Sequence, residues 1–130
     1  MFYQCSVTIP AGTAKESPEQ VYLQVSKGTI QRWFVGFPPG CAGLAHVSLY
    51  WHEQKVFPAG EEESVHWDDY VFDPLEDLDL SEPPYRLKVV GWNDDTSYEH
   101  TVQVAVVVFP TPDVTTEGLL ERMLHAFVGG

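Results

Sequence analysis

The feature that most constrains this chain is a series of short segments in which apolar and polar residues alternate, each closed by proline, glycine or asparagine. This alternation is typical of β-strands that face a core on one side, and the closing residues favour turns. The best candidates are residues 3–9, 29–37, 44–51, 85–92 and 98–109, with shorter strands at 21–25, 55–57 and 70–72. About eight strands with such turns predict an all-β fold, an antiparallel β-sandwich. We expect a jelly roll, although another Greek-key order fits the same periodicity.

The segment 29–37 differs from the other expected strands because both of its faces are apolar. Trp33, Val35 and Phe37 fall on one face, and Ile30 and Phe34 fall on the other. A strand of this kind is either covered on both sides or presents one face to a partner. Ile30 and Phe34 are therefore candidate contacts to a binding partner.

Two other stretches carry local signals. Lys27-Gly28 is typical of a tight turn, so the strands at 21–25 and 29–37 are expected to form a hairpin. Residues 61–82 contain ten acidic residues and no lysine or arginine, and they show the weakest pattern of regular structure apart from 70–72.

The period of the sequence changes after Pro110-Thr111-Pro112, which divides the chain into a β-sandwich domain at 1–110 and a linker with a short amphipathic helix at 111–130. The apolar face of this helix consists of Leu119, Leu120, Met123, Leu124 and Phe127. A helix this short is marginal alone, so it must bury that face. It packs either on its own sandwich or in a groove of a neighbouring subunit, which makes these five residues candidate partner contacts.

Charge and length limit the classes of partner. The chain has 130 residues, enough for one domain, and a net charge of −12 from 19 acidic and 7 basic residues. This balance opposes binding to nucleic acid or to anionic membranes. No apolar run is long enough to span a membrane, and the N-terminus lacks a secretory pattern, so a soluble protein is expected. Cys5 has the spacing of a buried residue and Cys41 lies in a turn; a bridge between them stays open.

Motifs for catalysis or for metal binding are missing from the sequence. Its five histidines are scattered, and no zinc, P-loop or serine-hydrolase motif occurs. We therefore expect a protein that is not an enzyme, with no catalytic residues, no metal and no cofactor. An alternative is a domain stabilised by calcium, because carboxylates are hard oxygen ligands. The candidates for that alternative are Asp68, Asp69, Asp73, Glu76, Asp77 and Asp79.

A second alternative is a carbohydrate-binding module, in which exposed aromatic rings stack on sugars. Trp33 and Trp51 are in phase with core positions, whereas Trp67 and Trp92 lie near turns. Trp67 and Trp92 are therefore the candidates for glycan stacking, although aromatic side chains more often supply core or interface area.

Three segments occurring in this order resemble small structural proteins of tailed bacteriophages and of related uncultured viruses. They are IPAGT at 9–13, the stretch from GTI at 28–30 to FPPGCAGL at 37–44, and the stretch from PYRL at 84–87 through GWNDD at 91–95 to EH at 99–100. The resemblance covers most of the chain up to Pro110 and carries no catalytic residues. It implies a virion structural protein: a capsid decoration or cement protein on a repeated lattice, or a tail or adaptor component.

The partners that this resemblance implies are a major capsid protein or another virion protein, together with further copies of the chain. Oligomers on capsid lattices follow the lattice symmetry, so a trimer is the favoured homo-oligomer. Neither nucleic acid nor a membrane is expected as a partner.

Overall fold

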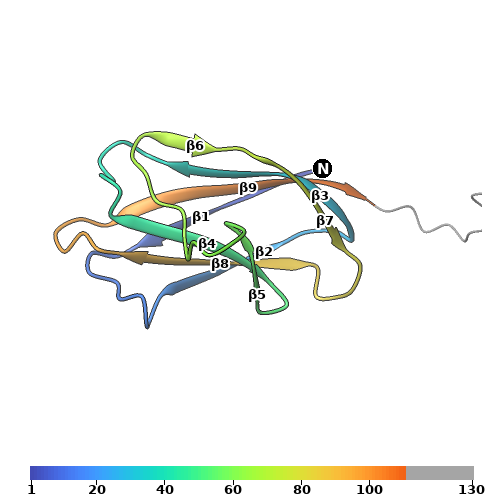
Figure 1. The fold of residues 1–130 in the computed structure, drawn as a ribbon, viewed down its shortest axis with the longest axis horizontal. Helices are drawn as coiled ribbons and strands as arrows, with labels where there is room; N and C mark the ends of the chain where they lie inside the picture. Colours follow the sequence, from blue (N-terminus) through green and yellow to red (C-terminus); the bar gives the residue numbers. More distant parts are fainter. Residues whose placement is uncertain (111–130) are drawn as a thin grey trace, which may run out of the picture.

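The computed structural model describes residues 1–110, which form β-strands and connecting loops (Figure 1). The strands are β1 (Phe2–Ile9), β2 (Glu19–Gln24), β3 (Gly28–Phe37), β4 (Ala45–Trp51), β5 (Gln54–Phe57), β6 (Tyr70–Phe72), β7 (Leu75–Leu80), β8 (Arg86–Asn93) and β9 (His100–Pro110). No helix capable of crossing a membrane occurs in this part of the chain.

The strands form two antiparallel sheets. Sheet A has the order β1-β9-β3-β6, with β7 also paired to β3, and sheet B has the order β2-β8-β4-β5. The pairing is nested: β1 pairs with β9, β2 with β8, β3 with β6 and β7, and β4 with β5. Two further pairs complete the sheets. In sheet A, β3 also pairs with β9, and in sheet B, β4 also pairs with β8.

One hydrophobic core, built from side chains of both sheets, lies between their inner faces. Strand alternation builds it: every second residue of β9, from Val102 to Val108, is fully buried, as are Ala45, Val47 and Leu49 of β4. Trp33 of β3 is the largest of the fully buried side chains in the described residues. Burial of each large apolar side chain stabilises the fold by about 1.5–3 kcal/mol, so this core supplies the main driving force for packing the sheets.

Most of the predicted strands are confirmed, and residues 70–72 coincide with β6. The fold class is also confirmed as all-β with two antiparallel sheets. The amphipathic helix predicted within 111–130, with its five apolar contact residues, lies outside the described residues.

The hairpin predicted around Lys27-Gly28 is wrong, because β2 belongs to sheet B and β3 belongs to sheet A. The amide of Val25 still donates to the carbonyl of Tyr85, 2.9 Å away, and the chain then crosses to the other sheet. A Cβ on Gly28 would lie 2.4 Å from the carbonyl oxygen of Phe109. The glycine is therefore required by a close approach of two strands rather than by a tight hairpin turn.

The acidic stretch contains a strand that the sequence analysis missed. In β7, Leu78 and Leu80 point inward, and so does Glu76, which interrupts the apolar alternation. The carboxylate of Glu76 accepts a hydrogen bond from the indole Nε1–H of Trp33 at 2.9 Å. An acidic residue at an inward position is tolerated because this partner satisfies it.

The face assigned to Ile30 is also corrected. A β-bulge lies between Ile30 and Arg32, where the pairing of β3 with both β7 and β9 shifts register. The extra residue reverses the alternation, so Ile30 is fully buried on the same side as Trp33. Ile30 is not available as a surface contact.

Both cysteines are free thiols. Cys41, which was expected in a turn, is fully buried. Cys5, which was expected to be buried, is only half-buried. Burial raises the pKa of both thiols above the ordinary value.

Candidate functional site: the outer faces of the two sheets

The outer face of sheet A carries exposed apolar side chains. Cross-strand pairing places Phe2 of β1 beside Val107 of β9, which pairs in turn with Arg32 of β3 and through it with Leu75 of β7. The exposed fractions are 59% for Phe2 and 75% for Leu75. This cross-strand row brings together residues that are far apart in the sequence.

Phe34, one of the predicted partner contacts, lies on this face. Its ring meets that of Phe2 in an edge-to-face arrangement with centroids 6.0 Å apart, and it is half-buried. Phe109, at the end of β9, is 54% exposed. We call the four residues Phe2, Phe34, Leu75 and Phe109 the sheet A patch. Phe2 and Phe34 are in contact, whereas Arg32 lies between Val107 and Leu75 in the same row. Exposed apolar groups that gather on one face typically mark interaction surfaces.

A second aromatic group lies at β6. Trp67, Tyr70 and Phe72 line a shallow hollow of about 230 Å³, and the ring centroids of Trp67 and Tyr70 are 6.2 Å apart. Trp67 is 57% exposed, as predicted. Its surroundings are apolar, so this hollow has few groups that could hydrogen-bond a sugar.

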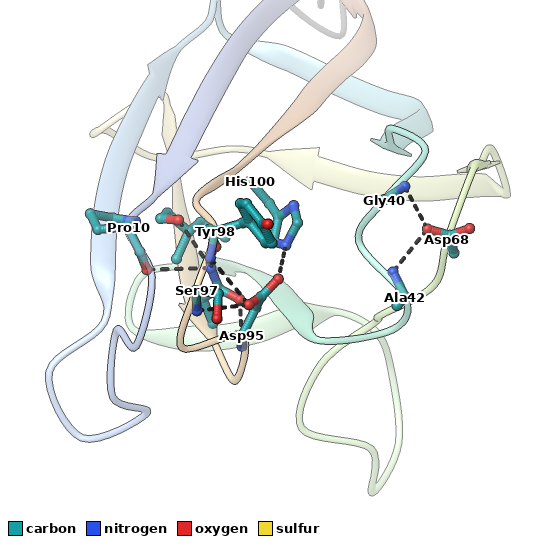
Figure 2. Close-up of polar contacts among 10 residues, drawn as sticks. Pro10, Gly40, Ala42, Asp68, Asp95, Ser97, Tyr98 and His100 are labelled. Carbon is teal, nitrogen blue, oxygen red and sulfur yellow. Dashed lines mark hydrogen bonds and ion pairs between the residues drawn. The ribbon is translucent and has the colours of Figure 1, made fainter.

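Asp68, one of the candidate calcium ligands, has a structural role. Its Oδ1 accepts hydrogen bonds from the backbone amides of Gly40 and Ala42, at 2.9 and 2.8 Å (Figure 2). This carboxylate joins the loop after β3 to the loop before β6. Among residues 1–110, no three His, Cys, Asp or Glu side chains form a cluster that could hold a metal ion.

The outer face of sheet B differs in character, because it is lined by tyrosines and cations. Lys88 of β8 lies between Tyr22 of β2 and Tyr50 of β4 in the pairing register. Arg86 lies over the ring of Tyr22, with its guanidinium carbon 4.2 Å from the centroid, and the Lys88 ammonium lies 5.3 Å from the centroid of Tyr50. Both are cation–π distances.

Three hollows follow one another along this face. The first, of about 390 Å³, is lined by Tyr22, Tyr50, His52, Glu53, Pro83, Pro84, Arg86 and Lys88. The second, of about 510 Å³, is lined by Lys15, Pro18, Gln20, Tyr50, Lys55, Glu63, Lys88, Val90 and Trp92. The third, of about 520 Å³, is lined by Lys15, His46, Glu61, Glu62, Glu63, Ser64, His66, Trp92 and Asp94. Each shares residues with the next, and we call the three together the sheet B track.

Trp92 does not present its ring to solvent, contrary to the prediction. It is 8% exposed, and its ring stacks on the imidazole of His46 with centroids 5.0 Å apart and planes 5° apart. The ammonium of Lys15, which forms an ion pair with Glu63, lies 5.8 Å from the Trp92 ring centroid. Trp92 is thus part of the floor of the sheet B track rather than a platform for stacking a sugar.

His46 links a serine to an aspartate, a chain that no spacing in the sequence indicates. Its Nδ1 lies 2.9 Å from Ser64 Oγ, and its Nε2 lies 2.9 Å from Asp94 Oδ2. The neutral tautomer with a proton on Nε2 satisfies both bonds, because Ser64 then donates and Asp94 accepts. Burial lowers the pKa of His46, and the neighbouring His66 lowers it further, against the raising effect of Asp94.

This order of groups is that of a serine-hydrolase triad, and all three residues line the third hollow. Ser64 is 9% exposed, and the adjacent Val65 exchanges two backbone hydrogen bonds with Val47 of β4, at 3.0 and 2.9 Å. The chain of hydrogen bonds therefore holds the acidic loop at 61–66 against sheet B.

Comparisons with known proteins give little further information. No family model and no curated protein matches this chain. Among solved structures, it is similar to the Tobacco streak virus coat protein dimer, with 14% sequence identity and a TM-score of 0.37. The aligned region covers 90% of this chain and 92% of the coat-protein chain. A likeness at this level assigns no family.

Proposed function

We propose that this chain is a non-enzymatic virion structural protein with a jelly-roll fold, a capsid decoration or cement protein that binds a repeated lattice. In this proposal its partners are a major capsid protein and further copies of itself, with a trimer favoured. The observation that carries the proposal is the sheet A patch, a set of exposed apolar side chains on the outer face of an antiparallel sheet.

The nested pairing of strands supports the jelly roll. If β6 and β7 are counted as one interrupted strand, the chain has eight strands in which the first pairs with the last, the second with the seventh, the third with the sixth and the fourth with the fifth. This is one long antiparallel hairpin rolled into two sheets, which is the double Greek key of a jelly roll. The fold occurs in viral capsid proteins and in lectins, so it allows the function without assigning it.

Charge supports a protein–protein role for the sheet A patch. The chain has a net charge of −12, which keeps it soluble and opposes non-specific self-association. A specific partner must therefore supply either complementary charge or enough apolar contact to overcome repulsion. Phe2 and Leu75 offer such contact because both are exposed and lie in the same cross-strand row of sheet A, on β1 and β7.

Co-sedimentation with assembled shells of the major capsid protein from the same virus tests this proposal. The full chain is expected to bind in a fixed ratio to shell subunits, and Leu75→Asp should weaken binding at least about tenfold by burying a charge in the interface. Tyr98→Asp is the matched control, because Tyr98 is 71% exposed in the loop before β9 and lies outside the patch. Absence of binding, or equal loss in both variants, would contradict the proposal.

The non-enzymatic part of the proposal has its own test at Ser64. A fluorophosphonate probe labels serines that a histidine activates. We expect no labelling of the native protein, because the Ser64 hydroxyl is buried against His46. Labelling that disappears in Ser64→Ala would overturn this assignment and make the Ser64–His46–Asp94 chain catalytic.

A further inference from the structure

The sheet B track collects the cations of an acidic protein. Residues 1–110 contain six lysines and arginines, and four of them, Lys15, Lys55, Arg86 and Lys88, line the track. The other two, Lys27 and Arg32, lie on the crossing to sheet A and on β3. The first two hollows hold these four cations against two carboxylates, Glu53 and Glu63, in a chain whose net charge is −12.

Arg86 is placed to bind an anion. Its guanidinium is stacked 4.2 Å above the ring of Tyr22, and none of the ion pairs among the described residues involves it. A stacked guanidinium keeps its N–H groups at the rim of the ring, where they can hold a carboxylate in a bidentate manner. Arg86 therefore combines a fixed orientation with donors that no side chain within residues 1–110 engages in an ion pair.

Lys88 extends this anion site toward the centre of the sheet. It contacts Tyr50 by its ammonium group and forms an ion pair of 2.7 Å with Glu53. The Lys88 side chain is 15% exposed, whereas that of Glu53 is 79% exposed. An exposed carboxylate of this kind is weakly held, so an incoming anion can replace Glu53 at the ammonium.

The track is long and open rather than a closed pocket. Its hollows are joined through Tyr50 and Lys88 at one junction and through Lys15, Glu63 and Trp92 at the other. Along β8, the distance from Arg86 to Trp92 is about 20 Å at the usual rise per residue of a strand. Such a groove fits an extended chain molecule better than a compact metabolite.

We propose that the sheet B track binds a linear acidic saccharide, a glycan chain that carries carboxylate groups. Arg86 and Lys88 hold a carboxylate, and the rings of Tyr22 and Tyr50 pack against the C–H faces of the sugar units. Glu53 and Glu63 accept hydrogen bonds from sugar hydroxyls. This mixture of cations, carboxylates and aromatic rings suits a ligand with both charges and hydroxyl groups.

Nucleic acid is a poorer match for the same surface. Its phosphates form a continuous line of negative charge, and Glu53, Glu61, Glu62 and Glu63 lie along the track among the cations. A saccharide tolerates these carboxylates better because every sugar unit also carries hydroxyl groups that can donate hydrogen bonds to them. The inference does not depend on the proposed virion function, which uses the opposite sheet face.

Isothermal titration calorimetry of the full chain with a panel of acidic hexasaccharides tests the proposal, with hexagalacturonate as the first probe and maltohexaose as the neutral control. At least one acidic hexasaccharide is expected to bind at low salt and maltohexaose is not, and binding should weaken as ionic strength rises. In the double variant Arg86→Gln/Lys88→Gln, the affinity should fall about tenfold or more, because charge-assisted hydrogen bonds are lost.

The matched control is Lys27→Gln/Arg32→Gln, which removes the same amount of charge from residues outside the track. This control should bind the saccharide with an affinity within about twofold of that of the native chain. Any loss in it measures the effect of net charge alone. No binding by any acidic hexasaccharide, equal losses in the two double variants, or tighter binding of a single-stranded oligonucleotide than of the saccharides would each overturn the proposal. A melting curve of each variant confirms that the fold is intact.

Discussion

At the scale of single residues, the side chain of Asn93 has a dense set of hydrogen bonds within the described part of the chain. It is 1% exposed, and its Nδ2 lies 3.2 Å from the carbonyl oxygen of Ile9, 3.3 Å from that of Pro10 and 2.9 Å from that of Tyr98. Its Oδ1 accepts from the amide of Asp95 at 2.9 Å. One amide therefore joins the end of β1 to the β8–β9 connection, next to the Asp95 contacts shown in Figure 2.

Asn93→Ala should lower the free energy of unfolding by about 2–4 kcal/mol, because it removes a buried amide that donates to the carbonyls of Ile9 and Tyr98 and accepts from Asp95. Guanidinium denaturation followed by circular dichroism measures this. Asn93→Asp keeps an acceptor for Asp95 but removes the donors, so it should be at least as destabilising. A change below about 0.5 kcal/mol for Asn93→Ala would show that the network contributes little.

Ser48, unlike Asn93, is a buried polar side chain without a hydrogen-bond partner among the described residues. Its Oγ is fully buried and has no hydrogen-bond partner in the described part of the chain. Because a buried hydroxyl without a partner carries a desolvation cost, Ser48→Ala should raise the free energy of unfolding by about 1 kcal/mol or leave it unchanged. Ser64→Ala is a suitable comparison and should lower it, since Ser64 Oγ bonds His46. Destabilisation by Ser48→Ala would indicate a partner for this hydroxyl.

At the scale of elements, the His46 network connects the acidic loop at 61–66 to sheet B, and the connection should depend on pH. The pKa of His46 in the folded protein is lowered, chiefly by burial. A histidine whose folded pKa lies below its unfolded value of about 6.5 contributes full stability above that value. The contribution is lost as the pH falls through 6.5 toward the folded pKa.

The free energy of unfolding should therefore decrease between about pH 7 and pH 5, and His46→Gln should reduce this slope. Denaturation at a series of pH values measures both. Asp95 titrates outside this window: its pKa is lowered, first by the amide of Ser97 and then by His100, so its contribution is lost only below about pH 4. An unchanged slope in His46→Gln would remove the histidine from the pH response.

Close packing between the two sheets predicts that a larger residue at Gly91 destabilises the fold. A Cβ on Gly91 of β8 would lie 2.7 Å from Cδ1 of Ile9 on β1. Gly91→Ala should therefore destabilise the fold by about 1–3 kcal/mol through overpacking. The double variant Gly91→Ala/Ile9→Val removes the clashing methyl and should recover part of the loss. Additive losses in the double variant would place the cause elsewhere, for example in backbone conformation.

The strands could be predicted because alternation is a local property of the sequence, as in the valines of β9 that are fully buried. What could not be predicted depends on contacts between distant segments. Glu76 points inward because Trp33 supplies a donor, and Ile30 is buried because a bulge reverses the alternation. The tyrosines at positions 22 and 50 flank Lys88 only through the order of strands in sheet B. Periodicity contains no information on that order.

At the scale of the whole molecule, the two outer faces should respond to salt in opposite ways. Copies of a chain with a net charge of −12 repel one another, and salt screens that repulsion, with a Debye length of about 10 Å at 0.1 M. Contact through the apolar sheet A patch should therefore strengthen as salt rises. Ligand binding to the cations of the sheet B track should weaken, because the attraction is screened.

Sedimentation velocity of the full chain between about 50 and 500 mM sodium chloride measures the first response. We expect the proportion of oligomer to increase with salt in the native chain and in Tyr98→Asp, and to stay low in Leu75→Asp. Oligomers that dissociate as salt rises would instead indicate an interface held by ion pairs between copies. The sheet A patch would then not be the contact surface, whatever the outcome of the saccharide titration.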